Sequence, residues 1–518
     1  MPRAQVLIVG AGPTGLVLAL WLTKCGISVR CIDAASGPGT TSRAMVLHAR
    51  NLEFYHQLGI DQAAIREGLK FIALNLWARG EKKGRVAFGE VGKSLSPYAY
   101  VLIYPQDLHE QMLVAQLHTL GVDVEWNVSL VESAEHDARV SATIKTASGA
   151  AESIEVDYLA GCDGAHSTVR EQLAIGFPGG TYAETFYVAD IRGRGAVLDG
   201  ELHVDLDQAD FVIVFPMRGT GRARLIGTLR EDAGEESQLE WGDVSQAILQ
   251  RLRLEVDEVR WFSTYRVHHR VADHFQRGRT FLLGDAAHIH SPVGGQGMNT
   301  GIGDAVNLAW KLAAVLRGAA PDLLATYEAE RIGFARTLVA TTDRAFSLVT
   351  ARGPIATGVR QRIVPFVLPR LFQIDFLRRF FFRTLSQLAI HYPDSPLSQS
   401  LPSPAAAGTT GGGNRLPWVS LGEEGASGDN FAPLVSRDWQ LHRYGDASRG
   451  AEAWCRERGL ALHSFPWSPA AQEGGLAHNT NYLIRPDGYV AIGLAGSDFG
   501  PIERYLERWE IAPGQQAG

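Results

Sequence analysis

Three glycines near the amino terminus have the spacing of a phosphate-binding turn. They lie between an apolar segment, 4–9, and a stretch of helical character, 16–24. In such a turn the first glycine permits a tight bend, the second lets N–H groups approach a pyrophosphate, and the third lets helix and strand pack closely. Asp33, 18 residues beyond the last of them, is placed to accept hydrogen bonds from a ribose. The pattern predicts a dinucleotide site without distinguishing NAD from FAD. The glycines are Gly10, Gly12 and Gly15.

A second turn follows the apolar segment 156–162. Asp163 and Gly164 occupy it, and Thr168 with Glu171 is a candidate capping box for a helix that begins there. Taken alone, these residues are also typical of an ordinary connection between a strand and a helix.

The most informative run follows the apolar segment 279–283. Gly284 and Asp285 close that segment at the carboxyl end of an expected strand, where α/β sheets present ligand-binding residues. A glycine-rich loop, 291–301, then leads into an expected helix from about Gly303 to Leu316, whose apolar residues recur every three or four positions. N–H groups at a helix N-terminus stabilise negative charge. The loop residues offered for that role are Gly297, Met298 and Asn299.

These motifs require a scaffold in which strands alternate with helices. A chain of 518 residues exceeds the roughly 250–300 residues of a single core, so we expect two or three domains. The expected fold is α/β, with a Rossmann-like domain, an inserted antiparallel-sheet substrate domain, connecting helices and a small C-terminal domain. The expected boundaries are 1–178 with 265–345, then 179–264 (to which 73–99 contributes), 346–400 and 415–518, with a linker at 401–414.

Together the three runs resemble the class A flavoprotein aromatic hydroxylases, the family of para-hydroxybenzoate hydroxylase and phenol hydroxylase. The resemblance covers roughly residues 4–345 and implies that the cofactor is FAD. In that family the Asp-Gly motif serves FAD and the nicotinamide, and the aspartate of the Gly-Asp motif holds the ribityl chain. An arginine and a glutamine of the family also contact FAD. The matching residues are Asp163 with Gly164, Gly284 with Asp285, Arg43 and Gln106.

The resemblance also implies the reaction. NADPH or NADH would reduce the flavin, and O2 would then form a C4a-hydroperoxide that hydroxylates a phenolic or polycyclic aromatic molecule. Pro292 matches the family's proline on the flavin face. His48 is our candidate for the base that deprotonates a phenol, and Tyr187 and Phe215 are our candidates for the substrate pocket. Each of these three residues is also compatible with an ordinary place in the core.

The substrate class is narrowed by one departure from the family. In para-hydroxybenzoate hydroxylase an arginine on the inserted sheet grips the substrate carboxylate, but Arg218, Arg222 and Arg224 do not align with that position. We therefore expect a neutral phenol or a larger polycyclic aromatic. Two alternatives remain. A flavin halogenase is disfavoured because the GWxWxIP motif is absent, and a relative that keeps FAD without turnover, acting as a substrate-sequestering protein, stays open.

The C-terminal region resembles the thioredoxin-like domain of phenol hydroxylase, with a helix at 451–458 and a hairpin that closes at Pro486-Asp487-Gly488. Cys455 is its only cysteine, which excludes CxxC redox chemistry and favours a structural or oligomeric role. The apolar and basic segment 346–398 is expected either to pack on the FAD domain or to form a homodimer contact.

Composition excludes several classes of partner. A net charge of −7 argues against binding to nucleic acid, and cysteines without CxxC spacing indicate reduced thiols in a cytoplasmic protein. His288 and His290 lack a third ligand at a useful spacing, so we expect no metal. Prolines and charges interrupt the apolar stretch 363–382, which is therefore no membrane span.

Overall fold

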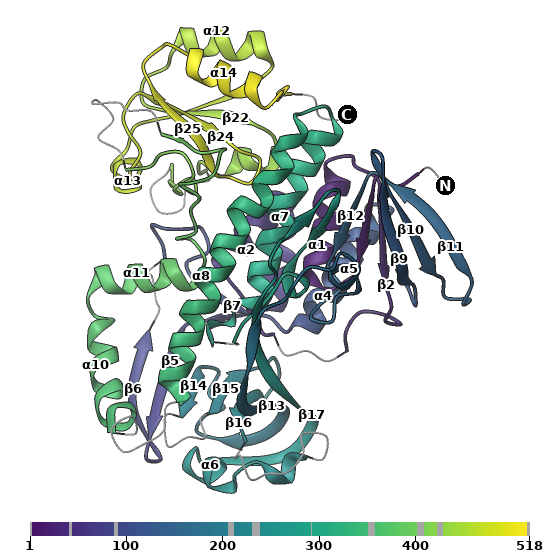
Figure 1. Ribbon diagram of the computed structural model, residues 1–518. Helices are drawn as coiled ribbons and strands as arrows, with labels where there is room; N and C mark the ends of the chain where they lie inside the picture. The colour runs from purple at the N-terminus through teal and green to yellow at the C-terminus, as the bar shows by residue number, and fades with distance from the viewer. Residues whose placement is uncertain are drawn as a thin grey trace.

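The computed structural model describes residues 3–40, 44–87, 92–205, 212–229, 239–291, 293–350, 358–400, 409–421 and 428–514. Figure 1 shows a dinucleotide-type α/β domain, a large antiparallel sheet below it, a pair of outer helices at one side and a C-terminal α/β domain at the top. The expected α/β class with an inserted antiparallel sheet is confirmed. None of the described helices has the length and apolar composition needed to cross a bilayer.

A mostly parallel sheet carries the three turns that the sequence singles out. Its central strand is fully buried, as a continuous apolar run predicts for a strand covered on both faces. The helices α1 and α7 pack together against it, and a small antiparallel sheet contributes to the same hydrophobic core (Figure 1). The main strands, in spatial order, are β18 (Gln276–Arg277), β19 (Thr280–Leu282), β12 (Tyr158–Gly161), β1 (Val6–Val9), β2 (Val29–Asp33) and β8 (Val124–Trp126). The small sheet consists of β11 (Ala151–Val156), β10 (Arg139–Lys145) and β9 (Ser129–His136).

Seven helices of the described residues belong to this part of the molecule. They are α1 (Pro13–Lys24), α2 (Ala49–Leu58), α3 (Asp61–Glu67), α4 (Gln106–Thr119), α5 (Thr168–Gln172), α7 (Gly297–Leu316) and α8 (Ala325–Thr350). A short sheet of β3 (Val46–Leu47), β7 (Val101–Ile103) and β4 (Leu69–Phe71) lies beside α2 and α4.

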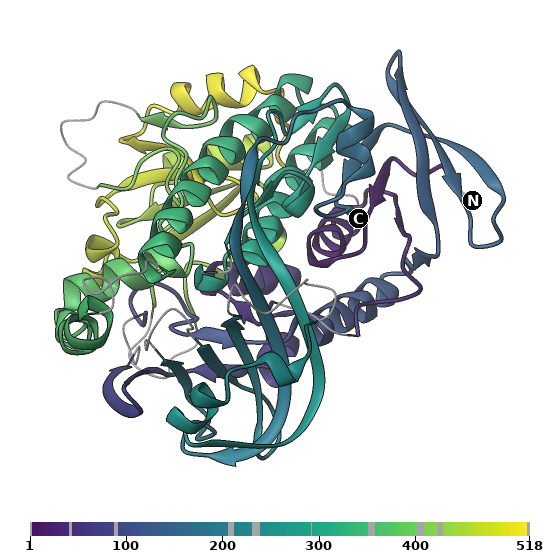
Figure 2. The same cartoon turned by 60° about the horizontal axis from the view of Figure 1, so that its bottom comes forward.

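The large antiparallel sheet is built around two long, paired strands that run from the dinucleotide-type domain into the lower domain (Figure 2). Its order is β20 (His288–Ile289), β17 (Leu254–Val271), β13 (Gly179–Gly195), β16 (Arg222–Thr228), β15 (Val212–Pro216), β14 (Leu202–Asp205), β5 (Ala73–Ala78) and β6 (Glu81–Ala87). One face packs with α6 (Gln246–Arg251), and the other contributes to a separate apolar cluster. The alternation of side chains along each strand therefore buries both faces.

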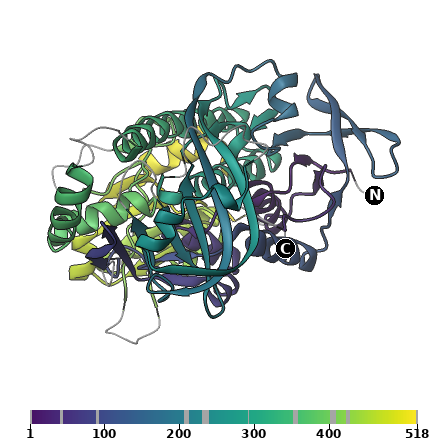
Figure 3. The same ribbon diagram turned by 90° about the horizontal axis from the view of Figure 1, so that it is seen from below.

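Two outer helices, α10 (Val364–Leu371) and α11 (Asp375–Leu385), follow the short π-helix Val359–Ile363 and stand at one edge of the molecule in Figure 1 and Figure 3. The C-terminal domain then has the strand order β21 (Gln399–Ser400), β25 (Val490–Ala495), β24 (Thr480–Ile484), β22 (Gln440–Tyr444) and β23 (Ala461–Phe465). Its helices are α12 (Arg449–Arg458), α13 (Pro469–Glu473) and α14 (Gly500–Arg508). The predicted hairpin at Pro486-Asp487-Gly488 joins β24 to β25, while the thioredoxin-like assignment stays a prediction.

The end of the expected linker is not free of the fold. Of the segment 401–414, residues 401–408 lie outside the described residues. In the remainder, the N–H groups of Thr410 and Gly413 donate to the carbonyls of Gly475 and Val490 at 3.0 and 2.8 Å. These hydrogen bonds, which attach the segment to the C-terminal domain, are made by backbone groups. The side-chain composition of the segment therefore could not predict them.

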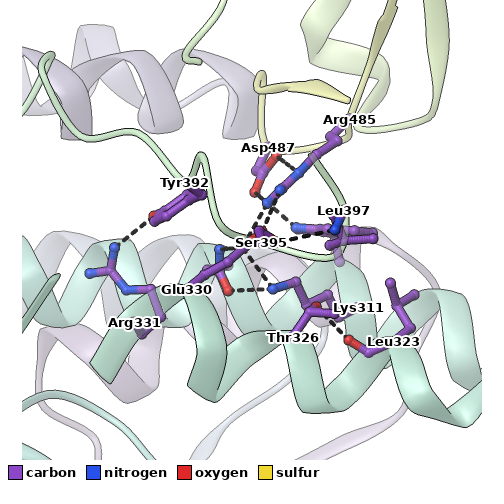
Figure 4. A network of polar contacts seen from close by, with 12 residues as sticks. Lys311, Leu323, Thr326, Glu330, Arg331, Tyr392, Ser395, Leu397, Arg485 and Asp487 are labelled. Atoms are coloured by element: carbon purple, nitrogen blue, oxygen red, sulfur yellow. Dashed lines mark hydrogen bonds and ion pairs between the residues drawn. The ribbon is translucent and has the colours of Figure 1, made fainter. Parts of the chain in front are cut away.

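Buried charges join the C-terminal domain to α7 and α8 (Figure 4). Arg485, in the β24–β25 hairpin, binds both carboxylate oxygens of Glu330 at 2.6 and 3.0 Å and also binds Asp487. Lys311 of α7 approaches the same Glu330 carboxylate at 2.9 Å. All four side chains are at most 1% exposed. Two cations thus neutralise two carboxylates in the interior.

The pKa values in this network follow from burial and from the neighbouring charges. Burial lowers the pKa of Lys311 to about 8, although Glu330 opposes the shift. Burial alone would raise the pKa of Glu330, but Arg485 and Lys311 hold it well below its usual value. Ser395 and Asn307 donate further hydrogen bonds to the Glu330 carboxylate at 2.7 and 2.6 Å. Each charged side chain of this network neutralises another, so removing one leaves a buried charge without its partner.

We predict that Glu330→Gln lowers the free energy of unfolding by about 3–5 kcal/mol, because Asp487 would be the one carboxylate left for the two buried cations Lys311 and Arg485. The measurement is the first unfolding transition in urea, followed by tryptophan fluorescence, since Trp310 and Trp439 stack edge-on at this interface. The matched control is Glu155→Gln in the exposed pair with Arg139, expected to cost at most about 1 kcal/mol. Equal losses in the two variants would contradict the role of the network.

Candidate functional site

Of the three glycines in the first turn, two have no room for a side chain and one has open space beside it. A Cβ atom on Gly10, whose φ is +104°, would lie 2.3 Å from the carbonyl oxygen of Cys162. A Cβ on Gly15 would lie 2.0 Å from the Gly10 oxygen, whereas a Cβ on Gly12 would meet nothing within 4 Å. The fold itself therefore excludes side chains at Gly10 and Gly15. The space beside Gly12 is free for a pyrophosphate that approaches the N-terminus of α1.

Asp33 fixes the shape of that turn. One carboxylate oxygen accepts a hydrogen bond from the N–H of Ala11 at 2.6 Å, and the other accepts from Ala35 at 2.7 Å. The side chain stays partly exposed at the end of β2. Each oxygen keeps a further lone pair, so ribose binding by Asp33 stays compatible with this geometry and stays a prediction.

The second turn is held by its aspartate. Asp163 accepts hydrogen bonds from the Ser167 hydroxyl at 2.5 Å and from the Val169 N–H at 3.1 Å, and burial raises the pKa of its carboxyl. The expected capping box was placed one residue too late: Ser167, not Thr168, caps α5 by accepting from the Arg170 N–H. The adjacent Gly164 has a φ of +79°, and a Cβ there would meet nothing within 4 Å.

The third turn places a free carboxylate at the end of β19. Asp304 of α7 accepts from the Gly284 N–H at 3.1 Å and from His288 Nε2 at 2.7 Å, which fixes the turn from behind. Among the described residues, none donates a hydrogen bond to the carboxylate of Asp285. Its side chain is accessible, yet the surrounding protein raises the pKa of the carboxyl. An acceptor without an internal partner fits a hydroxyl-bearing chain such as ribityl.

The glycine-rich loop is clamped by Asn299. The side-chain amide of Asn299 donates to the carbonyls of Val46 and Gly295 at 2.8 and 2.7 Å, and its oxygen accepts from the His48 N–H and from Asn51, each at 2.8 Å. The side chain is fully buried. The side-chain amide of Asn299 therefore makes all its hydrogen bonds within the protein, and its backbone N–H is the group left to bind a cofactor.

Helix α7 begins at Gly297, six residues earlier than its apolar periodicity predicted. The polar residues of the first turn fit a helix because Asn299 and Thr300 bond to nearby backbone carbonyls. No side chain caps this N-terminus, so the N–H groups of Gly297, Met298 and Asn299 stand at the positive end of the helix dipole. That arrangement fits an anionic ring edge. Arg43 and Pro292, both predicted to contact the flavin, lie outside the described residues.

His48 lies behind the loop. It is fully buried, and its Nε2 is 3.0 Å from the Gly294 carbonyl oxygen. Burial lowers the pKa of His48 to about 4, so the imidazole is neutral near pH 7. Its Nδ1 has no hydrogen-bond partner among the described residues. The side chain supports the loop directly, and its role as a catalytic base stays a prediction.

Gln106 occupies the first position of α4. Its side-chain amide donates to Glu110 at 2.7 Å, and the other Glu110 oxygen accepts from the Gly39 N–H at 2.8 Å. Burial raises the pKa of the Glu110 carboxyl. The pair thereby links α4 to the segment that follows β2, and the contact of Gln106 with a flavin chain stays a prediction.

The structure separates the two aromatic residues assigned to the pocket. Phe215 packs with the apolar cluster that includes Val46, next to the glycine-rich loop. Tyr187 is fully buried on the opposite face of the same sheet, where it stacks on Phe262 at 6.1 Å between ring centroids. β13 and β15 therefore present the two rings to different layers, and which of them lines a substrate pocket stays a prediction.

The residues that close the Phe215 cluster from outside were not predicted from the sequence. Leu368, Phe372 and Leu385 of α10 and α11 belong to that cluster. The carbonyl of Leu385 also accepts from Gln296 of the glycine-rich loop at 2.9 Å. The spacing of four between Leu368 and Phe372 was a readable signal for a buried helical face.

Of the three arginines considered for a substrate carboxylate, Arg224 and Arg218 are engaged by other parts of the described protein. Arg224 is 1% exposed and forms a two-pronged ion pair with Asp190 at 2.6 and 2.8 Å. Arg218 instead donates to the carbonyl of Arg66. Within the described part of the chain no three His, Cys, Asp or Glu side chains are grouped as metal ligands.

Comparison with known proteins places these features in a family. Residues 3–342 match the family model described as an FAD binding domain. The chain is 34% identical to the 6-methylpretetramide 4-monooxygenase of Streptomyces rimosus, over 99% of this chain and 95% of that protein. It is 33% identical to the pentachlorophenol 4-monooxygenase of Sphingobium chlorophenolicum, over 70% and 67%. The solved structure of the anhydrotetracycline hydroxylase OxyS from Streptomyces rimosus superposes with a TM-score of 0.77 at 27% identity, over 99% of this chain and all of that one.

We predict that Gly12→Ala weakens the binding of FAD by roughly tenfold or more while leaving the stability of the apoprotein unchanged, since its methyl group would fill open space. Titration of flavin fluorescence and thermal unfolding of the apoprotein measure the two effects. Gly15→Ala should instead lower stability, and Gly333→Ala, at an exposed glycine within α8, should leave FAD affinity unchanged and raise stability by about 0.5–1 kcal/mol. If Gly12→Ala kept full affinity for FAD, the placement of the pyrophosphate beside Gly12 would be wrong.

We also predict a loss of stability as the pH falls from about 6.5 to about 4. The folded-state pKa values of His48, His109 and His290 are lowered to about 4, 3 and 4 by burial. Below pH 6.5 these histidines are protonated in the unfolded chain but not in the folded chain. Each of them therefore lowers the free energy of unfolding by roughly 1–3 kcal/mol. His48→Gln should reduce the proton uptake on unfolding at pH 5 by about one proton, measured from the pH dependence of urea unfolding. The exposed His118→Gln should leave it unchanged, and an unchanged slope in His48→Gln would refute the assignment.

Proposed function

Since the chain belongs to the FAD-binding-domain family and is an FAD-dependent aromatic monooxygenase that uses NADPH or NADH, we propose that it hydroxylates a neutral, polycyclic phenolic substrate. The observation that carries the proposal is the position of the Phe215 cluster. This apolar cluster borders the glycine-rich loop, and the one buried arginine of the adjoining described strands is already paired.

The residues of the three turns would hold FAD. The open space beside Gly12 would take the pyrophosphate, and the free carboxylate of Asp285 would accept from the ribityl hydroxyls. The first-turn N–H groups of α7 would face negative charge on the ring. Bound FAD would supply hydride uptake from the nicotinamide and activation of O2. Arg43, Pro292 and Gln106 are proposed as further contacts on the basis of the family pattern.

The chain's own contribution to turnover is to keep water out and to hold the loop still. The cluster that includes Phe215 reaches the loop through Val46 and Leu385, and its apolar surface would limit access of water to the reacting groups. Gln296 is fixed by the Leu385 carbonyl and by Gln387, which donates to its oxygen at 2.8 Å. Because these contacts come from the last residue of α11 and from Gln387 just after it, the end of that helix positions the loop as well as closing the cluster.

His48 is proposed as the base that accepts the phenol proton. Its neutral form near pH 7 can accept a proton, and its buried Nδ1 has no hydrogen-bond partner among the described residues. Its contact with the Gly294 carbonyl keeps it next to the loop. The same contact also supports a purely positioning role, which predicts that His48 substitution changes FAD binding rather than the pH profile of turnover.

The neutrality of the substrate follows from Arg224. Its guanidinium is occupied by Asp190, so a substrate carboxylate would have to break a buried ion pair to reach it. The names of the relatives point to the same class, since two act on polycyclic compounds of the tetracycline series and one on a phenol.

We further propose a cytoplasmic location, because all four cysteines are free thiols. The homodimer expected from the sequence stays a prediction, to be checked by the mass of the protein in solution.

We predict that polycyclic phenols accelerate NADPH or NADH oxidation by the FAD-loaded protein, and that the product gains one oxygen atom, traced with labelled O2. A phenol and its carboxylated analogue form the matched pair, and the neutral compound should have at least about tenfold higher kcat/KM because the carboxylate would be buried without a partner. Tight binding of the phenols without nicotinamide oxidation would identify a substrate-sequestering relative instead. Preference for the carboxylated analogue would contradict the proposed substrate class.

A further inference from the structure

The outer helices expose most of the large apolar side chains that remain uncovered. Of the 14 exposed large hydrophobic residues among those described, nine lie between Val359 and Phe381. Contiguous apolar surface of this kind marks an interaction site on proteins that are otherwise polar outside. We call this surface, formed by the segment 359–381, the α10–α11 face.

The exposed residues follow helical periodicity. Ile363, Val367 and Leu371 are spaced four apart along α10, and each is 40–51% exposed. On α11, Phe376 and Phe380 are also four apart and are 74% and 63% exposed. The inward sides of the same helices already pack in the Phe215 cluster. A helix that is apolar on two sides ordinarily has both sides covered, so the outer stripe calls for a partner.

The charge of the same segment is opposite to that of the whole chain. Residues 358–385 contain six arginines and one acidic residue, Asp375, in a chain of net charge −7. Two of the arginines have acidic partners, since Arg378 pairs with Asp375 and Arg379 with Glu473. The face is therefore cationic as well as apolar. The arginines are Arg360, Arg362, Arg370, Arg378, Arg379 and Arg383.

We propose that the α10–α11 face binds the surface of an anionic lipid membrane. Exposed phenylalanines beside arginines are the composition of helices that lie in a lipid headgroup region, where the rings are buried and the cations meet anionic lipids. A second copy fits less well, because a two-fold contact would set the same arginines against each other. The helices also form an outer edge of the molecule in all three ribbon views (Figures 1–3), so a flat surface can reach them.

A membrane contact at this face would also affect how the substrate reaches the site. This second inference rests on the proposed function, whereas the membrane contact itself does not. The helices that would lie on the lipid are the ones whose inner residues, such as Phe372, pack beside Phe215. A polycyclic phenol partitions into lipid. Docking through this face would bring the apolar cluster next to the phase in which the substrate concentrates.

The test is co-sedimentation of the FAD-loaded protein with vesicles of phosphatidylglycerol and phosphatidylcholine, compared with vesicles of phosphatidylcholine alone. We expect binding to the anionic vesicles only, and at least about tenfold weaker binding for Phe376→Ser with Phe380→Ser, since burying even one such ring contributes more than a factor of ten. Arg362→Gln with Arg370→Gln should also weaken binding, and high salt should weaken that of the unaltered protein. The matched control, Val131→Ser with Val435→Ser, removes exposed apolar residues elsewhere and should bind as the parent does.

Absence of binding to anionic vesicles would overturn the proposal. So would equal loss in the control variant, or a dimer in light scattering that Phe376→Ser with Phe380→Ser converts to monomer, because a second copy would then cover the face. Since the readout needs no turnover, a failed vesicle experiment leaves the proposed hydroxylation untouched, and a failed turnover assay leaves the membrane contact untouched.

Discussion

The carboxylate of Glu330 is the point on which the arrangement of the molecule depends. It lies on α8 without any exposure to solvent, and it accepts from a cation of α7 and a cation of the C-terminal hairpin (Figure 4). A carboxylate in that position is tolerable only while Lys311 and Arg485 are both present. The two long helices and the C-terminal domain are therefore held together by a requirement for charge balance as well as by apolar packing.

Helix α7 transmits this constraint to the ligand-binding turns. Asp304, 26 residues before Glu330, holds the Gly284 turn through its N–H and is itself held by Arg331 at 2.6 Å. Asn299 holds the glycine-rich loop from the first turn of the same helix. In these two turns the groups proposed to touch FAD are backbone N–H groups and the carboxylate of Asp285, and the side chains behind them supply the rigidity.

How far the sequence could predict the structure follows from the range of each interaction. The first turn could be predicted because the glycine spacing is itself a local pattern, although only the requirement at Gly15 is set by a sequence neighbour, Gly10, while that at Gly10 is set by the distant Cys162 backbone. The true cap of α5 and the first turn of α7 were missed because side-chain bonds, not apolar periodicity, decide where those helices begin. Strand alternation indicates that β13 and β15 have two faces, but it did not predict that Tyr187 and Phe215 lie on different ones. The pairing of Glu330 with Arg485 joins positions 155 residues apart, so no local sequence pattern predicts it.

That pairing also constrains how such chains can diverge. A lineage that loses the C-terminal domain also loses Arg485 and leaves Glu330 facing an emptied interface, so the two positions cannot drift independently. We expect relatives that end before this domain to carry an apolar or small polar residue in place of Glu330, and relatives that retain it to conserve the pair or replace both members at once. Domain gain and loss in such lineages is then coupled to a single position on α8.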